Sequence, residues 1–369
     1  MSGCFIAESL EALKQQNVTS TVIAATPLHR PRKWPNPDAP ADWVRYLQFP
    51  GNLGLSSAGR LLDARLQARV QQLCRSKRID IIHAHAALPC GHAAALLAKQ
   101  CGIPFVVTVH GLDVFNTCFM GGMPAAWRGR VSIDVYRQAR TVICISEKVR
   151  NALRVRMQDD VRTAVVYNGT DPQRFSPAPS PKPQQGSEIL VVGNLLQGKG
   201  HELLLSAIAR LRSSFPQVRC RIVGEGPDRA RFSELVNRLG IAEQVQFLGR
   251  FNRNEVADAM RNCTVFALPS TYEGLGCVYL EAMSCGKPVI ACQGQGIDEI
   301  VEHGKNGWLI PVNGLDQLVR GLSTLLSSAE LRSQIGRAAR QTILGNFTLS
   351  HQAQELARVY QEAMRGAHR

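Results

Sequence analysis

Two glutamates, Glu273 and Glu281, stand eight residues apart in the stretch EGLGCVYLEAMSCGKPVIAC. The glycines at 274 and 276 indicate a turn, and residues 277–285 are typical of a helix that ends at the following Gly-Lys-Pro. Free N–H groups at the start of this helix would attract an anion, and Glu281 would lie about 10 Å along it at about 1.5 Å per residue. The layout fits a nucleoside diphosphate sugar, with the diphosphate at the helix start, ribose at Glu281 and the sugar at Glu273.

The spacing of the two acids does not decide this question by itself. The chain holds 16 glutamates, so roughly one pair at this spacing is expected by chance. An ordinary helix with two acids near it therefore stays open. The surrounding order of strand, turn, helix and strand is what favours a ligand site.

A second glycine-rich segment, GNLLQGKG at 193–200, follows an apolar run and opens a helical pattern. Its glycines would let backbone amides approach a ligand, and Lys199 adds an ammonium group at the helix start. The segment is neither a P-loop nor a GxGxxG fingerprint. A phosphate cradle and a simple strand–helix turn are equally consistent with it, and GEGPD at 224–228 has the same ambiguity.

Strand and helix patterns alternate along the whole chain, which predicts parallel sheets covered by helices on both faces. We predict a first domain over 1–175, a Pro- and Ser-rich linker over 176–187 and a second domain over 188–346. The last segment, 347–369, contains an amphipathic helix that we expect to pack back towards the first domain. Ligands of such sheets bind at the carboxyl ends of the strands. The apolar runs that we expect to be strands are 18–25, 79–85, 104–110, 141–146, 163–169, 188–193, 218–224, 244–249, 263–269 and 287–292.

Composition fits a soluble protein of 369 residues with 45% hydrophobic and 20% charged residues. No apolar run is long enough for a spanning helix, and the first residues do not have the pattern of an export signal. The 11 cysteines are scattered singly without a CxxC pair. This pattern predicts reduced thiols in a cytoplasmic protein rather than disulfides or a zinc site.

The net charge of +14 is concentrated in the first half. Residues 1–180 hold 22 basic against 12 acidic side chains, a balance of +10 that leaves +4 for the rest. HRPRKW at 29–34 and WRGRVSIDVYRQAR at 127–140 mix cations with tryptophan, which suits an anionic membrane surface and a lipid-diphosphate acceptor. An ordinary solvated basic face is the alternative, and nothing supports nucleic-acid binding.

Longer segments carry a family resemblance. The stretch from Pro269, PSTYEGLGCVYLEAMSCGKPVIACQGQGIDEIVEHGKNGWLI, resembles the donor-site core of retaining family-4 glycosyltransferases with the GT-B fold. VGNLLQGKGHELLLSAIARL, IVGEGPDR and VQFLGRF stand upstream of it in the family's order. VTVHGLDVF, ICISEKV and VVYNGTDPQRF in the first half are also similar to family segments, so the resemblance covers almost the whole chain.

The resemblance implies two doubly wound Rossmann-like domains that face a cleft, and a role for each matching residue. Glu273 would hold the transferred sugar, Glu281 the ribose and Lys199 the diphosphate. The stretch ending at Phe251 would border the base, and His110 would approach the donor sugar from the other domain. The implied catalytic residues are His110 and Glu273, and the implied donor-binding residues are Gly193, Asn194, Lys199, Phe251, Gly274, Leu275, Gly276 and Glu281.

Asn194 departs from the family, whose members commonly carry arginine there. An amide binds a phosphate without neutralising it, so Lys199 and the helix start would have to balance more of the charge. No DxD motif is present, and we expect neither a metal nor another cofactor. The family implies front-face attack by the acceptor without a dedicated nucleophile. His83 and His85 form an HAH pair, for which metal binding is the less favoured reading because no third ligand is evident.

The start of the sequence reads as turn, helix and strand, whereas GT-B proteins begin with a strand before that turn. We therefore expect the first strand to be missing and an open slot in the first sheet. The hypothesis is that the working protein starts roughly 15–25 residues upstream, enough for one strand and its turn.

Three functions remain open at this point. Transfer of a sugar from a UDP- or GDP-type donor to a glycan or lipid-linked acceptor leads. The protein would be cytoplasmic, either free or peripheral on the cytoplasmic face of the inner membrane. The segment GQGIDEIVEHGKNG resembles bacterial enzymes that build exopolysaccharide, lipopolysaccharide or teichuronic-type chains. The alternatives are a nucleotide-sugar epimerase or hydrolase of the same fold and a catalytically inactive donor-binding subunit of an assembly complex.

Overall fold

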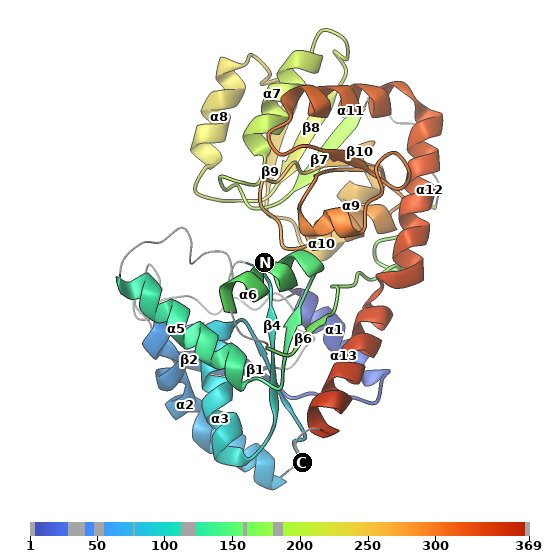
Figure 1. Cartoon of the computed structure of the whole chain (residues 1–369). Coiled ribbons are helices and arrows are strands. Elements are labelled where there is room, and N and C mark those ends of the chain that lie inside the picture. Colours follow the sequence, from blue (N-terminus) through green and yellow to red (C-terminus); the bar gives the residue numbers. More distant parts are fainter. Residues whose placement is uncertain are drawn as a thin grey trace. The chain divides into compact units, whose positions relative to one another are not determined.

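The computed structural model describes residues 4–28, 41–47, 55–76, 78–111, 123–157, 161–179 and 187–365. The chain divides into two compact units (Figure 1). The first comprises Met1–Tyr167 with Leu349–Arg369, and the second comprises Asn168–Thr348. Both units are built from parallel strands and helices.

The first unit contains two parallel sheets within its described residues. One sheet has the order β3-β4-β5-β6, formed by Ile82–His85, Phe105–Val109, Thr141–Cys144 and Thr163–Val165. The other pairs β1 (Val22–Pro27) with β2 (Ala41–Tyr46). The strands β4 and β5 are buried throughout, as expected of central strands. The described residues of this unit thus form two separate hydrogen-bonded sheets, and the missing first strand stays a prediction.

Two apolar clusters hold these sheets to their helices. One packs α2 (Leu55–Ser76) and α3 (His92–Cys101) against Ile23 and Ala25 of β1 and Ile82 of β3. The other packs α1 (Cys4–Lys14) and α13 (Leu349–Arg365) against Val106 and Ile143. The remaining elements are the short helix η2 (Ala87–Gly91), α5 (Met123–Gln138) and α6 (Glu147–Met157).

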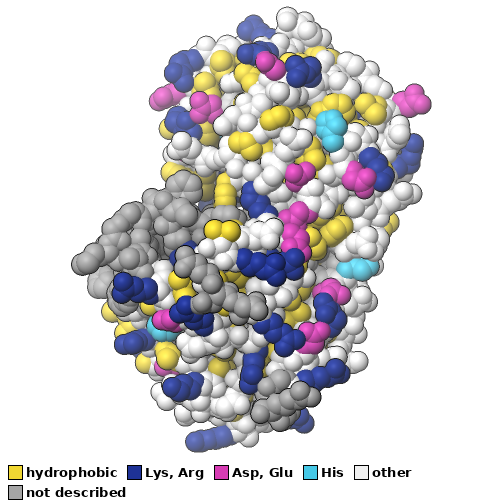
Figure 2. All heavy atoms as spheres, viewed as in Figure 1, with side chains coloured by type: hydrophobic (Ala, Val, Ile, Leu, Met, Phe, Trp, Pro, Cys, Tyr) yellow, Lys and Arg dark blue, Asp and Glu magenta, His cyan; other side chains and the backbone are white. Residues whose placement is uncertain are grey.

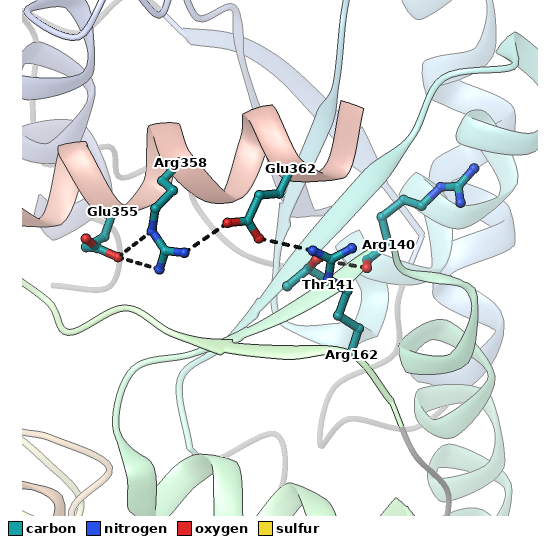
Figure 3. A network of polar contacts seen from close by, with 6 residues as sticks. All are labelled: Arg140, Thr141, Arg162, Glu355, Arg358 and Glu362. Carbon is teal, nitrogen blue, oxygen red and sulfur yellow. Dashed lines mark hydrogen bonds and ion pairs between the residues drawn. The ribbon is translucent and has the colours of Figure 1, made fainter. Parts of the chain in front are cut away.

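The last helix, α13, packs on the first unit although it follows the second in sequence. Leu356, Val359 and Tyr360 belong to the same buried cluster as Leu13 of α1. On its exposed side Glu362 accepts from Arg162 at 3.1 Å, and Arg358 pairs with both Glu355 and Glu362 (Figure 3). Exposed pairs of this kind contribute little stability, so the apolar contacts hold the helix.

The second unit is one six-stranded parallel sheet in the order β12-β11-β10-β7-β8-β9. The chain starts at the central β7, winds outward to β8 and β9, and then returns to the other side at β10. The strands β7 and β10 therefore flank a topological switch point, where open sheets of this type bind ligands. The strands are β7 (Glu188–Val192), β8 (Arg219–Val223), β9 (Val245–Gly249), β10 (Val265–Ala267), β11 (Val289–Cys292) and β12 (Trp308–Ile310).

Helices cover this second sheet and supply its site. Buried apolar side chains fill the strands β7, β10 and β11. Short turns at carboxyl ends of the strands lead into α7 and α10. The helical elements are α7 (His201–Leu211), α8 (Arg229–Arg238), α9 (Arg253–Asn262), α10 (Cys277–Ser284), η3 (Gly296–Glu299), α11 (Leu315–Ser327) and α12 (Ala329–Asn346).

The structure divides the chain after Tyr167, whereas the sequence predicts a boundary after residue 175. The intervening segment is fixed to the second unit by its carbonyl groups. Arg261 donates to the carbonyls of Arg174 and Ser176, and Ser284 donates to that of Phe175 at 2.6 Å. Phe175 is itself fully buried. These contacts join different sequence regions, so composition alone does not reveal them.

The structure also bears on the two expectations about membrane-spanning helices and cysteine thiols. No helix in the described ranges is both long and apolar enough to cross a membrane. Nine of the cysteines in these ranges, from Cys74 to Cys292, are free thiols. Burial raises the pKa of Cys220, Cys263 and Cys292 to about 12. These three cysteines therefore behave as small apolar side chains.

Candidate functional site

The turn after β7 and the loop after β10 meet at the switch point of the second unit. The backbone N–H of Thr271 donates to the carbonyl of Gly198 at 2.9 Å, and its hydroxyl donates to the same oxygen at 3.2 Å. A Cβ on Gly200 would lie 2.1 Å from the carbonyl oxygen of Pro269. Gly200 also has a φ of 78° as the residue before α7. Glycine is therefore required for the two loops to approach this closely.

The loop after β8 joins them from the other side. Gly193 donates its N–H to the carbonyl of Val223 at 3.0 Å, and Leu195 donates to that of Glu225 at 3.1 Å. A Cβ on Gly224 would lie 1.9 Å from the carbonyl oxygen of Gly193. Three strand ends thus converge on one backbone surface, and the glycines of GNLLQGKG and GEGPD are what permit it.

Glu273 is held in the loop that precedes α10. Its carboxylate accepts from Lys199 at 2.6 Å, with the two side chains only 14% and 27% exposed. Its backbone N–H donates to the side chain of Gln295 at 2.9 Å, and its carbonyl accepts from Gly296 at 3.1 Å. A Cβ on Gly296 would lie 1.8 Å from the carbonyl oxygen of Gly274. The start of η3 therefore clamps the turn that carries Glu273.

The helix α10 begins directly after this turn. Gly276 precedes it with a φ of 83° and provides no side-chain cap, so N–H groups of the first turn are directed at the loop region. Leu275 is fully buried and the Tyr279 hydroxyl donates to the carbonyl of Leu268, which anchors the helix to β10. Glu281, on the second turn, is 3% exposed.

Glu281 forms an ion pair with Arg253, the first residue of α9. Arg253 Nη1 lies 2.6 Å from Glu281 Oε1, and the side chains are 22% and 4% exposed. Phe251, two residues before Arg253, is partly buried in the turn that follows β9. The two carboxylates of the EGLGCVYLE motif are thus both paired with cations, one with Lys199 and the other with Arg253.

Asn194 and His201 shape the turn after β7. The side chain of Asn194 is exposed, whereas its carbonyl oxygen lies 3.1 Å from Nε2 of the buried His201. Burial lowers the pKa of His201, so this imidazole is neutral and its Nε2–H donates to the carbonyl. His201 thereby fixes the turn at the position where its backbone approaches the loop after β8.

A second polar cluster lies in the first unit, at the carboxyl ends of β3 and β4. His83 Nδ1 lies 2.6 Å from the Tyr360 hydroxyl, and its Nε2 lies 2.7 Å from the Thr108 hydroxyl. His85 Nδ1 lies 3.0 Å from His110 Nε2. The rings of His83 and His85 stack with centroids 4.4 Å apart.

Three of these imidazoles are neutral near pH 7. Burial, together with the nearby His110, lowers the pKa of His83 to about 3. Burial lowers the pKa of His110 to about 4, and burial with its two histidine neighbours holds the pKa of His85 well below its usual value. The bond between His85 and His110 therefore carries a single proton, donated by one ring and accepted by the other.

Among the described residues no group of three or more histidine, cysteine, aspartate or glutamate side chains is arranged to hold a metal ion. Both nitrogens of His83 are engaged by hydroxyl groups. The HAH pair is therefore part of a hydrogen-bonded cluster in this structure, joined by His110 from the next strand.

Comparisons with known proteins identify the family. The model for "Glycosyltransferase Family 4" matches residues 5–174, and that for "Glycosyl transferases group 1" matches residues 172–342. A glycosyltransferase of uncharacterised specificity from Methanocaldococcus jannaschii, MJ1178, is 30% identical over 277 residues, which are 73% of this chain and 72% of that protein. The chain is a member of this glycosyltransferase family.

Solved structures show that the glycosyltransferase has the GT-B fold. Sucrose-phosphate synthase from Thermosynechococcus elongatus superposes with a TM-score of 0.85 at 22% identity, over 99% of this chain and 94% of that one. HepE from Anabaena, solved with UDP and glucose, gives 0.73 at 25% identity over 88% and 86% of the two chains. The expected pair of Rossmann-like parallel-sheet domains is thereby confirmed.

The second unit of the glycosyltransferase collects all eight of the predicted donor-site residues. Glu273 and Lys199 are in direct contact, and Gly274, Leu275 and Gly276 form the turn between the two acids. His110 lies in the first unit, beside His85. The N-terminal sequence segments 29–34 and 112–115 lie outside the described residues.

Sequence reasoning missed three residues that shape this site: Arg253, Gln295 and His201. A signal was present for one of them. The pattern Asn252 to Glu255 predicts a capping box that starts a helix with Arg253 in its first turn. No local signal pairs Arg253 with Glu281, because that contact joins residues 28 positions apart.

Proposed function

We propose that this glycosyltransferase is a retaining hexosyltransferase that takes its sugar from a nucleoside diphosphate sugar. The observation that carries the proposal is the convergence of Glu273, Lys199 and the start of α10 at the switch point of the second unit. Backbone N–H groups and one ammonium group there match a diphosphate, and one carboxylate matches the hydroxyl groups of a sugar next to it. Glu281, one helix turn further, suits the vicinal hydroxyls of ribose.

The chemistry needed at this site is stabilisation of the leaving diphosphate. Glycosyl transfer passes through an oxocarbenium-like state as negative charge builds on the leaving group. Lys199 supplies a cation, and the starts of α7 and α10 supply backbone N–H groups. Groups of these kinds, held in fixed positions, stabilise such charge. We propose that they do so without a metal ion, and that Lys199 offsets the lack of an arginine at position 194.

We assign Glu273 to orientation of the sugar rather than to nucleophilic attack. Its backbone is clamped at both N–H and carbonyl, and its carboxylate is paired with Lys199, so it can accept sugar hydroxyls in a fixed direction. The family resemblance favours front-face attack by the acceptor with retention of configuration. His110 would then contact the donor sugar as a neutral hydrogen-bonding group, in keeping with its lowered pKa.

For the donor we take UDP-glucose as the first candidate, because HepE from Anabaena was solved with UDP and glucose. GDP- and ADP-sugars are the alternatives. We propose that the glycosyltransferase works in the synthesis of a cell-surface polysaccharide or glycoconjugate, as the resemblance of its GQGIDEIVEHGKNG segment suggests.

For the acceptor we propose a glycan on a lipid diphosphate, met at the cytoplasmic face of a membrane. Residues 130–157, which include most of α5 and all of α6, hold seven basic side chains against two acidic ones. Gly129 of α5 lies beside the Arg156 guanidinium of α6, so the helices share a surface. Val155, flanked by Arg154 and Arg156, is 82% exposed, and Lys and Arg side chains are spread over this unit (Figure 2). Such a face suits anionic lipid headgroups.

A donor screen tests the proposal. Thermal unfolding of the purified protein is followed with UDP, GDP, ADP and their hexose conjugates, and repeated for Glu281→Ala. Stabilisation by one nucleotide that the variant loses supports the donor site and identifies the base. Incubation of that donor with lipid-linked acceptor, followed by NMR of the product's anomeric proton, then tests retention.

The screen also separates the competing functions. Release of free sugar without acceptor would favour a hydrolase, and interconversion of the donor sugar would favour an epimerase. Binding without any turnover would favour a donor-binding subunit. If no nucleotide stabilises the protein, the proposal is wrong.

A further inference from the structure

Arg253 occupies a fixed position in the second unit. It is the first residue of α9, whose start is held by a capping box between Asn252 and Glu255. The Asn252 side chain accepts from the N–H groups of Asn254 and Glu255 at 3.0 Å each, and the Glu255 carboxylate accepts from the Asn252 N–H at 2.7 Å. The backbone from which the Arg253 side chain extends is therefore rigid.

The guanidinium group of Arg253 is held on two sides. Its carbon lies 4.8 Å from the centre of the Phe175 ring, and its Nη1 lies 2.6 Å from Glu281 Oε1. Phe175 is itself anchored, because its carbonyl accepts from Ser284 at 2.6 Å and from Arg340 at 3.4 Å. A planar cation stacked on a buried ring keeps one orientation, which a flexible ammonium would not.

This contact matters because Glu281 is almost completely buried, at 3% exposure. A buried carboxylate needs a charged partner, and removing that partner leaves an uncompensated charge. A carboxylate has about four lone-pair sites on two oxygens, and the bond from Arg253 to Oε1 fixes the directions in which these sites point. Recognition of two neighbouring hydroxyl groups depends on those directions.

We propose that Arg253 is a positioning residue of the donor site: it sets the Glu281 carboxylate in the orientation that accepts the vicinal hydroxyls of the donor's ribose. The inference rests on the proposed function, since it takes Glu281 as the ribose acceptor. By this inference, Arg253 and its stack on Phe175 help the site to select ribonucleotide donors over 2′-deoxyribonucleotide donors.

The test compares ribonucleotides with their 2′-deoxy forms in the full-length protein. Dissociation constants are measured by calorimetry for UDP and 2′-deoxy-UDP, and likewise for GDP and ADP with their deoxy forms. A hydrogen bond to a charged group makes a difference of roughly 10-fold or more, so the wild type is expected to prefer the ribonucleotide by about that factor. Arg253→Gln is expected to reduce the preference to about 2-fold or less, with part of it retained in Arg253→Lys.

Two controls separate positioning from general damage. Arg210→Gln removes an exposed ion pair with Asp316 in the same unit and is expected to leave the preference unchanged. In a Glu281→Gln background the Arg253→Gln change is expected to add no further loss, because both act through one carboxylate. Unfolding temperatures without nucleotide identify any variant that fails to fold, in which case Arg253→Lys and the Glu281→Gln background carry the comparison.

The outcomes are distinct. If Arg253→Gln and Arg253→Lys weaken UDP and 2′-deoxy-UDP equally and keep the wild-type preference, Arg253 is structural and the inference is overturned while the donor site stands. If the wild type binds no nucleotide of the panel, the proposed function and the inference fall together.

Discussion

The two polar clusters of this glycosyltransferase are built on opposite electrostatic principles. In the first unit His83, His85 and His110 are neutral imidazoles joined to hydroxyls and to each other. In the second unit Lys199, Glu273, Arg253 and Glu281 are charged side chains held in ion pairs. The first cluster suits a neutral reacting group, whereas the second suits a ligand that carries charge and many hydroxyls.

The difference shows how the ionisable side chains of each cluster are accommodated when they are buried. Histidine gives up its charge when it is buried, because desolvation lowers its pKa. A buried glutamate keeps its charge only with a cationic partner, and here such partners come from elsewhere in the fold. The first cluster should therefore respond to pH and the second to loss of a single partner.

The largest expected effect concerns the charged cluster. Lys199→Met removes the cation beside Glu273, and we expect kcat to fall by about 100- to 1,000-fold, as for loss of a single charge-stabilising group in other active sites. Steady-state kinetics with the donor identified by the screen measures it. Lys305→Met, which removes an exposed partner of Glu302, is the control. A fall of less than a few-fold would show that the leaving group is stabilised elsewhere.

The next effect is a pH dependence of the free energy of unfolding that comes from the neutral histidine cluster. Because the pKa of His110 is about 4 in the folded protein against 6.5 ordinarily, the unfolded chain takes up its proton first as pH falls. Stability is therefore fully present above pH 6.5 and decreases towards pH 4, by up to about 3 kcal/mol for this group.

Unfolding in urea at several pH values measures this effect. His110→Gln keeps a hydrogen-bonding group without the titrating proton, and its loss of stability between pH 6.5 and 4 should be smaller than that of the wild type. Parallel curves for the two proteins would mean that His110 is not neutral in the folded state.

A smaller effect concerns the turn that carries Glu273. Gly296→Ala places a Cβ against the carbonyl of Gly274, where the contact would be 1.8 Å. Overpacking of this kind costs about 1–3 kcal/mol, and we expect donor affinity to fall with it. The matched control is Gly345→Ala, where nothing lies within 4 Å of the added atom. Equal behaviour of the two variants in thermal unfolding and nucleotide binding would show that η3 does not clamp the turn.

The smallest effect tests the anchoring of the histidine cluster to α13. Tyr360→Phe removes the hydroxyl at 2.6 Å from His83, at a cost of about 1 kcal/mol in unfolding free energy. Val359→Ala, in the same helix but buried among apolar side chains, should lower stability without altering the histidine resonances in NMR spectra. If Tyr360→Phe leaves those resonances unchanged, the hydroxyl does not hold His83.

The sequence predicted the parts of the molecule whose signal is local. Apolar runs identified every described strand except β2 and β12, and the glycine pattern around Glu273 identified the start of α10. The strand β2 was missed because ADWVRY mixes charged with apolar residues. Its strand character comes from pairing with β1.

The remaining features depend on contacts between distant residues. Arg253 meets Glu281, His85 meets His110, and Tyr360 reaches His83 from the far end of the chain. Such contacts follow from strand order and helix packing, which composition and periodicity do not contain. The capping box at Asn252 locates Arg253 on a helix, but only the fold shows which acid it meets.

The chain enters and leaves the second unit at neighbouring positions. Thr170 donates to the carbonyl of Phe347 at 3.0 Å and bridges to Thr348, so the first and last residues of this unit are hydrogen-bonded neighbours. A continuous segment whose two ends meet can be exchanged between proteins as one block, since the host needs to accept only a single narrow junction. Residues 168–348 are therefore a block that is suited to exchange between proteins of this fold.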